Sequence, residues 1–152
     1  MQLSINPEQK PKIVIDTNIL VSAGIGKYGH SNEIVGQISG GIVENFTSEE
    51  ILGEIRDVFN REEITSKISE NDRRFLLAVY EQKSIKVNPM HTLDKIAKDP
   101  DDDKFFYCAL AANADCIISG DPHLLKIKEF QNIRVLRPKE FLEQTKSQDD
   151  KH

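Results

Sequence analysis

The chain lacks the features that mark membrane and secreted proteins. None of its apolar runs approaches the roughly 18 residues that a membrane-spanning helix requires. The opening segment, MQLSINPEQKPK, is polar and has no apolar core of the kind found in signal peptides. These absences predict a cytoplasmic protein that has no membrane partner.

Cysteine and positive charge are also scarce. The two cysteines, Cys108 and Cys116, lie in apolar segments and lack the CxxC spacing of metal and redox sites, so we expect reduced core residues. The formal net charge of -5 argues against a protein that binds nucleic acid by bulk electrostatics. Any contact with phosphate must therefore be local, or must go through bound cations.

What is present is the composition of a single globular domain. The chain has 152 residues, of which 38% are apolar and 30% charged. Short β-branched, apolar segments predict five strands, at 12–15, 41–46, 85–87, 116–119 and 133–136. The first is apolar on consecutive positions, which is typical of a strand buried on both faces of a parallel sheet.

Helical patterns separate these strands. Thr47 with Glu50 and Ser69 with Asp72 have the spacing of capping boxes, and Pro138 is expected to start a last helix over 139–144. Strands that alternate with helices predict one α/β domain with a mainly parallel sheet. We expect this domain to span 12–144, with an N-terminal extension at 1–11 and a flexible C-terminal tail at 145–152.

Four aspartates crowd ahead of an apolar segment in DPDDDKFFYCALA, which starts at Asp99. Helix capping explains Asp99, and acids in a first turn suit the helix dipole. On a helical wheel anchored at Phe105, however, Asp102 points along the core side, while Asp103 points towards solvent. A carboxylate on the core side is costly unless it lines a cleft or binds a cation, so we expect a functional role for Asp102.

Three further acids are candidates for the same cleft. Asp16 and Asp121 follow two predicted strands, and ligands of open α/β sheets bind outside the carboxyl ends of the strands. Asp121 precedes a proline and is equally well explained as a helix cap. Glu54 lies at the border of the apolar face of its helix, where a salt bridge is as good an explanation as a ligand.

Carboxylates that share a cleft raise one another's pKa values unless a cation neutralises them. Oxygen ligands without a histidine or cysteine partner select Mg²⁺ or Mn²⁺, and the histidines, His30, His91, His123 and His152, are isolated or lie in the tail. Divalent ions held by carboxylates commonly activate water and stabilise the leaving oxygen in phosphodiester hydrolysis.

Three blocks in order, KIVIDTNILVSA, SEEILGEIRDVF and DPDDDKFFYCALAANADCIISGD, resemble the PIN domain, and especially its toxin–antitoxin branch. The resemblance implies a three-layer α/β/α fold and a ribonuclease that depends on Mg²⁺ or Mn²⁺. It places the acidic site on Asp16, Glu54, Asp102 and Asp121, with Asn18, Asp99 and Ser119 in supporting positions. The adjacent aspartates leave room for Asp103 to align in place of Asp102.

The resemblance also implies partners. Toxins of this kind form homodimers, cleave RNA and are silenced by a small antitoxin protein. Basic residues near the expected cleft can touch an RNA backbone, although solvated surface is the more ordinary role for them; they are Lys104, Lys126, Lys128, Arg134, Arg137 and Lys139.

Two other functions fit parts of the pattern. One is a PIN fold that binds RNA or protein without cleaving it. The other is an aspartyl-phosphate phosphatase of the haloacid dehalogenase kind, but that chemistry needs a second acid two residues after the nucleophile, where this chain has Asn18.

Overall fold

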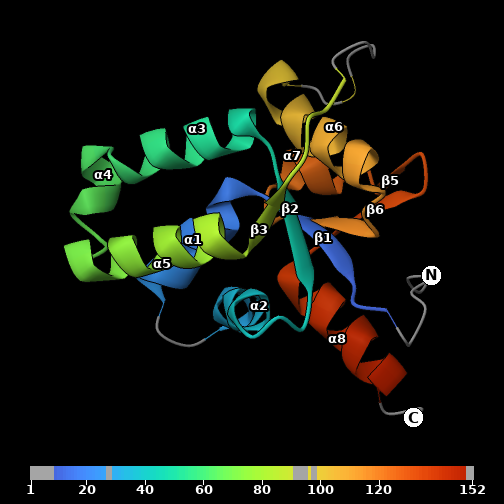
Figure 1. The fold of residues 1–152 in the computed structure, drawn as a ribbon, viewed down its shortest axis with the longest axis horizontal. Helices are drawn as coiled ribbons and strands as arrows, with labels where there is room; N and C mark the ends of the chain where they lie inside the picture. Colours follow the sequence, from blue (N-terminus) through green and yellow to red (C-terminus); the bar gives the residue numbers. More distant parts are fainter. Residues whose placement is uncertain (1–8, 27–28, 91–95, 97–98, 150–152) are drawn as a thin grey trace.

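The computed structural model describes residues 9–26, 29–90, 96 and 99–149 of the chain. Its centre is a sheet of six strands in the order β3-β2-β1-β4-β6-β5 (Figure 1). The strands are β1 (Lys12–Ile15), β2 (Glu44–Thr47), β3 (Ser84–Lys86), β4 (Cys116–Ile118), β5 (Glu129–Phe130) and β6 (Ile133–Leu136). All neighbours pair in parallel except β5 and β6.

The sheet confirms the predicted α/β class but corrects the predicted number of five strands. The additional strand, β5, has only two residues and pairs antiparallel with β6. It forms where the chain turns back on itself, through residues with positive φ at Lys128, Gln131 and Asn132. A strand of two residues carries no periodicity, so the sequence could not indicate it.

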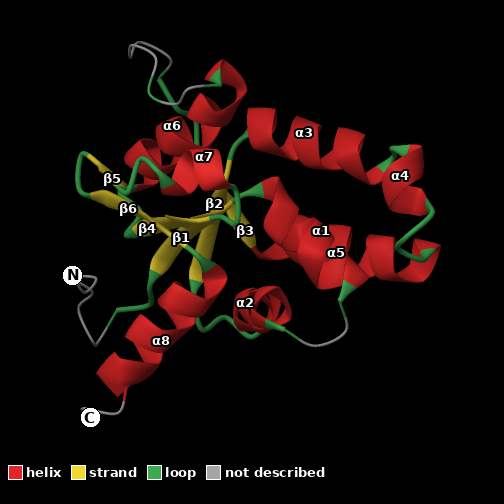
Figure 2. Cartoon of the chain, turned by 180° about the vertical axis from the view of Figure 1, so that it is seen from behind, coloured by secondary structure: helices red, strands yellow, loops and turns green. Residues whose placement is uncertain are grey.

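Helices connect the strands. They are α1 (Thr17–Ile25), α2 (His30–Ser39), α3 (Glu49–Phe59), α4 (Glu62–Thr65), α5 (Glu70–Lys83), α6 (Asp103–Ala112), α7 (Pro122–Leu125) and α8 (Pro138–Asp149), with a 3₁₀ turn, η1 (Pro100–Asp102), before α6. Helix α6 packs across β1, β2 and β4. Helices α2 and α8 lie on the opposite side of the sheet, which gives the three expected layers (Figure 2).

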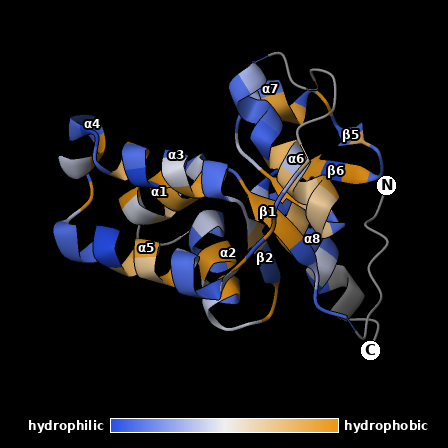
Figure 3. Cartoon of the chain, turned by 45° about the horizontal axis from the view of Figure 1, so that its top comes forward, coloured by the Kyte–Doolittle hydropathy of each residue, from blue (hydrophilic) through white to orange (hydrophobic). Residues whose placement is uncertain are grey.

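Burial of the two middle strands fixes the centre of the core. Ile13, Val14 and Ile15 of β1, and all of β4, have no exposed surface. Because helices cover both faces of these strands, their apolar residues are consecutive rather than alternating. In Figure 3 the hydrophobic colour marks β1 and β6, whereas α4 is mostly hydrophilic. Both cysteines are buried and free, as predicted.

The helix starts match the sequence patterns with one correction. Ser69 caps α5, as predicted, because its hydroxyl accepts a hydrogen bond from the Asp72 amide. The cap of α3 is Ser48 rather than Thr47, which is the last residue of β2 and accepts a hydrogen bond from the Tyr80 hydroxyl at 2.7 Å. The predicted cap at Thr47 is wrong because the Thr47 side chain is buried and bonded to Tyr80.

The last helix is longer than predicted. Helix α8 starts at Pro138 but continues to Asp149, past the expected end at 144, so the first five residues of the predicted tail are helical. Residues 150–152, and most of the predicted N-terminal extension, lie outside the described residues. In the described part of the chain, no helix is both long and apolar enough to cross a membrane.

Candidate active site

The strand order reverses between β1 and β4. The chain builds the sheet outward from β1 through β2 to β3, then crosses back and builds it in the other direction from β4. The two parallel strands leave their carboxyl ends side by side, with the Asp16 amide donating to the Ile118 carbonyl at 2.9 Å. In open α/β sheets such a point of reversal is where ligands bind.

Asp16 and Ser119 occupy this point and contact each other. The Ser119 hydroxyl donates to Asp16 Oδ2 at 2.7 Å and accepts a hydrogen bond from the Asp121 amide at 3.0 Å. Ser119 is fully buried, and Asp16 is only 5% exposed. One hydroxyl therefore links the ends of both middle strands.

Each of the two strand-end aspartates also caps a helix. Asp16 caps α1 through a hydrogen bond from the Asn18 amide, and Asp121 caps the short helix α7 by accepting from the His123 amide at 2.9 Å. Capping and a place in the cleft are thus not alternatives. The cap hydrogen bonds fix the direction of each carboxylate while leaving acceptor capacity free.

Asp102 belongs to the 3₁₀ turn that precedes α6 and is electrostatically coupled to these two acids. Desolvation raises the pKa of the Asp102 carboxyl to about 6, and the charges of Asp121, Asp16 and Asp99 add to this rise. Asp99 caps the turn by accepting from the Asp101 amide at 3.0 Å. The raised pKa shows that Asp102 lies within electrostatic reach of both strand ends.

The neighbouring Asp103 does not have the exposed position that the helical wheel predicted. It is 5% exposed, and its carboxylate accepts hydrogen bonds from the Ile96 amide at 3.2 and 3.3 Å. A helical wheel considers one helix alone, whereas Asp103, the first residue of α6, contacts Ile96 of the preceding loop. Asp103 thus anchors the preceding loop, and Asp102 is the acid that interacts with Asp16 and Asp121.

Asp16 experiences the same crowding. Burial raises the pKa of its carboxyl, and the charges of Glu54 and Asp121 raise it further, against the lowering effect of the hydrogen bonds from Ser119 and Asn18. Asp16 is therefore coupled to Glu54 and Asp121, and Asp102 to Asp16 and Asp121. The four acids predicted from the sequence converge at one edge of the sheet.

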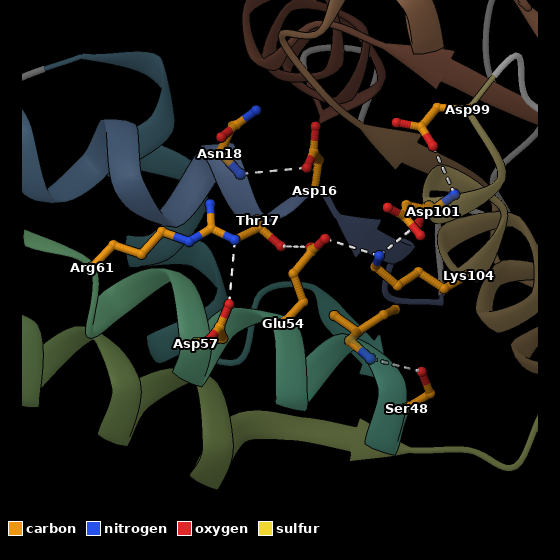
Figure 4. Close-up of polar contacts among 11 residues, drawn as sticks. Asp16, Thr17, Asn18, Ser48, Glu54, Asp57, Arg61, Asp99, Asp101 and Lys104 are labelled. Carbon is orange, nitrogen blue, oxygen red and sulfur yellow. Dashed lines mark hydrogen bonds and ion pairs between the residues drawn. The ribbon is translucent and has the colours of Figure 1, made fainter. Parts of the chain in front are cut away.

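Glu54 differs from the other three acids because protein groups hold both of its oxygens. The Thr17 hydroxyl donates to Oε2, and the ammonium of Lys104 lies 2.8 Å from Oε1 (Figure 4). The side chain of Lys104 is only 8% exposed, so its predicted role as solvated surface is wrong. Neither contact has a signal in the sequence, because Thr17, Glu54 and Lys104 lie in three different helices.

The donor set suits Mg²⁺ or Mn²⁺, because it consists of oxygen atoms whose charges repel one another. No three histidine, cysteine, aspartate or glutamate side chains in the described residues form a ready-made metal cluster. Mg²⁺ is commonly held by one or two carboxylates and water, which these acids can supply. The histidines form no part of this donor set: His30 and His123 are exposed, and His91 and His152 lie outside the described residues.

A hollow of about 540 Å³ adjoins the acids on the side of α1, α2 and α8. Asn18 and Gly120, which are close in sequence to Asp16 and Asp121, line one part of it. His30, Arg137 and Lys139 line another part and make it basic. An acidic cluster and a basic hollow are therefore neighbours at the same edge of the sheet.

Comparison with known proteins agrees with this architecture. A family model described as "PIN domain" matches residues 12–123. An uncharacterized protein of Methanocaldococcus jannaschii, MJ1680, is 32% identical over 145 residues, which cover 89% of this chain and 92% of that protein.

Among solved structures, the fold is similar to that of VapBC2 from Rickettsia felis, a complex bound to a DNA fragment of its promoter. The TM-score is 0.51 at 16% identity, over 82% of this chain and 96% of the other. The family match spans most of the described sheet and all four acids. The chain belongs to the PIN domain family.

Proposed function

We propose that the chain is a ribonuclease that depends on Mg²⁺ or Mn²⁺, hydrolyses phosphodiester bonds of RNA and serves as the toxin of a toxin–antitoxin pair. The observation that carries this proposal is the convergence of Asp16, Asp102 and Asp121 at the reversal point between β1 and β4. Membership of the PIN family supports a nuclease, because the resemblance of the three sequence blocks implies that activity.

The proposed roles follow from the surroundings of each side chain. Asp16, Asp102 and Asp121 hold the divalent ion, and Glu54 either contacts the ion or orients the attacking water. When bound, the ion activates water and stabilises the negative charge that develops on the phosphate. Ser119 keeps Asp16 in its orientation through the 2.7 Å hydrogen bond, whereas Asn18 and Asp99 support the loops that carry the acids.

The basic hollow gives the anionic substrate a place to bind. A cleft of four acids repels a phosphodiester backbone, so the substrate needs cations beside it. Arg137 and Lys139 lie on the hollow, and the Lys139 side chain makes no hydrogen bond or ion pair in the described part of the chain. We expect the RNA backbone to run from this hollow across the acids.

The direct test is the substitution Asp16→Asn with RNA and Mn²⁺ in the assay. The amide retains the size of the side chain and can accept from Ser119, but it removes the charge that attracts the ion. We expect cleavage to fall about a thousandfold, which corresponds to the several kcal/mol that a catalytic metal contributes. Circular dichroism should show an unchanged fold, and wild-type activity in this variant would refute the mechanism.

The proposed partners are a second copy of the chain and a small antitoxin. The structural neighbour named above is a VapBC2 complex, which supports an antitoxin partner for this chain. Co-expression with the product of the adjacent gene, followed by co-purification, tests the antitoxin. Light scattering of the isolated chain tests the homodimer.

The contacts of Glu54 favour a second candidate, a PIN fold that binds RNA or protein without cleaving it. A carboxylate held by Thr17 and Lys104 is less available to a metal than a free one, and the described residues contain no ready-made metal cluster. Calorimetric titration with Mn²⁺ separates the candidates. A nuclease binds the ion at millimolar concentration or below, whereas a module without activity shows no such site.

A further inference from the structure

Lys104 lies in a position that is unfavourable for a lysine unless a specific partner compensates it. It is the second residue of α6, where the positive end of the helix dipole repels a cation. Its side chain is 8% exposed, although lysine is among the residues that are least often buried. Removing an ammonium group from water costs several kcal/mol, so nearby groups must offset a large penalty.

The contacts of the ammonium group supply that compensation. Nζ lies 2.8 Å from Glu54 Oε1, donates to the Asp101 carbonyl at 2.5 Å and stands 5.5 Å from the centre of the Phe105 ring. The carbonyl belongs to the turn that carries Asp102. Lys104 thus connects the glutamate of α3 to the loop of the aspartates, as Figure 4 shows.

These contacts separate the four acids into two groups. Both oxygens of Glu54 are engaged, one by Lys104 and the other by Thr17. Asp16 and Asp121 make no ion pair in the described residues, and their protein donors are a hydroxyl and backbone amides. A cation entering the cleft therefore meets uncompensated charge on the aspartates and a neutralised charge on the glutamate.

We propose that Lys104 is a positioning residue: its ammonium holds Glu54 so that the divalent ion is bound by Asp16, Asp102 and Asp121, while Glu54 acts through water. This inference rests on the proposed nuclease function. Of the two roles given above for Glu54, contact with the ion or orientation of the attacking water, it selects the second. It also gives the site a fixed cation that limits the affinity for the metal while keeping the glutamate aligned.

The experiment measures Mn²⁺ affinity by calorimetry and RNA cleavage separately, on the full chain with Lys104→Met. Methionine keeps the length of the side chain and removes the charge. We expect Mn²⁺ to bind about tenfold more tightly, because the competing charge is gone and Glu54 is free to become a ligand. Cleavage should nevertheless fall about 10- to 100-fold, because the glutamate is no longer held in place.

Lys86→Met is the matched control. Lys86 of β3 pairs with Glu49, which lies in α3 as Glu54 does, but the side chains of Lys86 and Glu49 are both more than half exposed. Neither the Mn²⁺ affinity nor the cleavage rate should change in this variant. In the double variant Lys104→Met with Glu54→Gln, the gain in Mn²⁺ affinity should disappear, because the added ligand is absent.

A second variant keeps the inference testable if Lys104→Met does not fold. In the wild-type background, both Glu54→Gln and Asp102→Asn should weaken Mn²⁺ binding. The loss of affinity should be about tenfold or more greater for Asp102→Asn, because only the aspartate is a direct ligand. Equal losses in these two variants, or weaker or unchanged Mn²⁺ binding in a folded Lys104→Met variant, would overturn the inference. Absence of both Mn²⁺ binding and RNA cleavage in the wild-type chain would instead refute the proposed function itself.

Discussion

The two ends of the middle strands carry aspartates in opposite electrostatic surroundings. At the amino end of β4, burial raises the pKa of the Asp115 carboxyl, but its neighbours oppose this rise: the Lys12 amide donates a hydrogen bond to it at 2.8 Å, and the charge of Lys12 is positive. At the carboxyl ends, Asp16 and Asp102 have neighbours that raise their pKa values. At the first end a positive charge offsets the burial of the acid, whereas at the second end the acids add to one another's cost.

The fold stores unfavourable electrostatic energy at the carboxyl ends of the middle strands. Acids that raise one another's pKa destabilise the native state at neutral pH, so their persistence needs a reason other than stability. Asp115 has a sufficient structural reason, since it joins β4 to the start of β1. At the other end, helix capping accounts for Asp16 and Asp121, but the side chain of Asp102 makes no capping hydrogen bond and has no such structural reason.

The largest expected effect comes from replacing one aspartate at each end of the strands and comparing the two variants. Asp121→Ala should lower RNA cleavage about 100- to 1,000-fold, because it removes a proposed metal ligand. Asp115→Ala should leave the cleavage rate per folded molecule unchanged but lower the free energy of unfolding by about 1–3 kcal/mol, because the Lys12 amide loses its acceptor. Cleavage kinetics and urea denaturation check both variants, and a large loss of cleavage in Asp115→Ala would break the comparison.

A smaller effect concerns the pH dependence of stability without metal. The pKa of Asp102 is about 6 in the folded protein and lies above 3.8, the ordinary value for an aspartate. Its folded form therefore binds the proton more tightly, and the stability that it contributes is present below pH 3.8 and is lost as the pH rises through 6. Asp102→Asn removes this loss.

The measurement is urea denaturation in EDTA at several pH values between 4 and 7. The unfolding free energy of Asp102→Asn, minus that of the wild type, should increase over this range, because only the wild type loses stability as its Asp102 ionises. Asp101→Asn is the control, since Asp101 is exposed in the same turn. A difference that stays flat with pH would show that Asp102 is not crowded by the acids at the strand ends.

The smallest expected effect concerns the basic hollow. Arg137→Ala combined with Lys139→Ala should raise the KM for RNA several-fold and weaken its dependence on salt, with little change in kcat, because these cations contact the backbone rather than the scissile bond. Arg74→Ala is the control, because Arg74 pairs with Glu70 on the exposed surface of α5. An unchanged KM would show that the substrate does not cross the hollow.

The sequence predicted those parts of the fold that depend on local pattern. The run 12–15 indicated a buried strand because its apolar residues are consecutive, and Asp16 and Asp121 could be placed at one edge because parallel strands share a direction. Pro138 marked the start of α8 through its fixed φ. In these cases a few neighbouring residues contain all the necessary information.

The features that the sequence did not predict depend on distant partners or on irregular backbone. Lys104 is buried because Glu54 of another helix receives its charge, and no spacing along the chain encodes that contact. Asp103 is buried beside the loop that precedes the 3₁₀ turn, where the Ile96 amide donates to its carboxylate, and a helical wheel does not include that contact. Ser48 replaced Thr47 as the cap of α3 because Tyr80, far along the chain, takes the Thr47 hydroxyl as its acceptor.

The placement of the reversal point between the two innermost strands has a consequence for how the domain can vary. The outermost strands, β3 and β5, are three and two residues long. At least one other strand separates each of them from the reversal point at β1 and β4. Insertions, deletions or grafted loops at these margins should therefore leave the spacing of the acids untouched. The outer strands are where the architecture can acquire a new partner or a new length without rebuilding its chemistry.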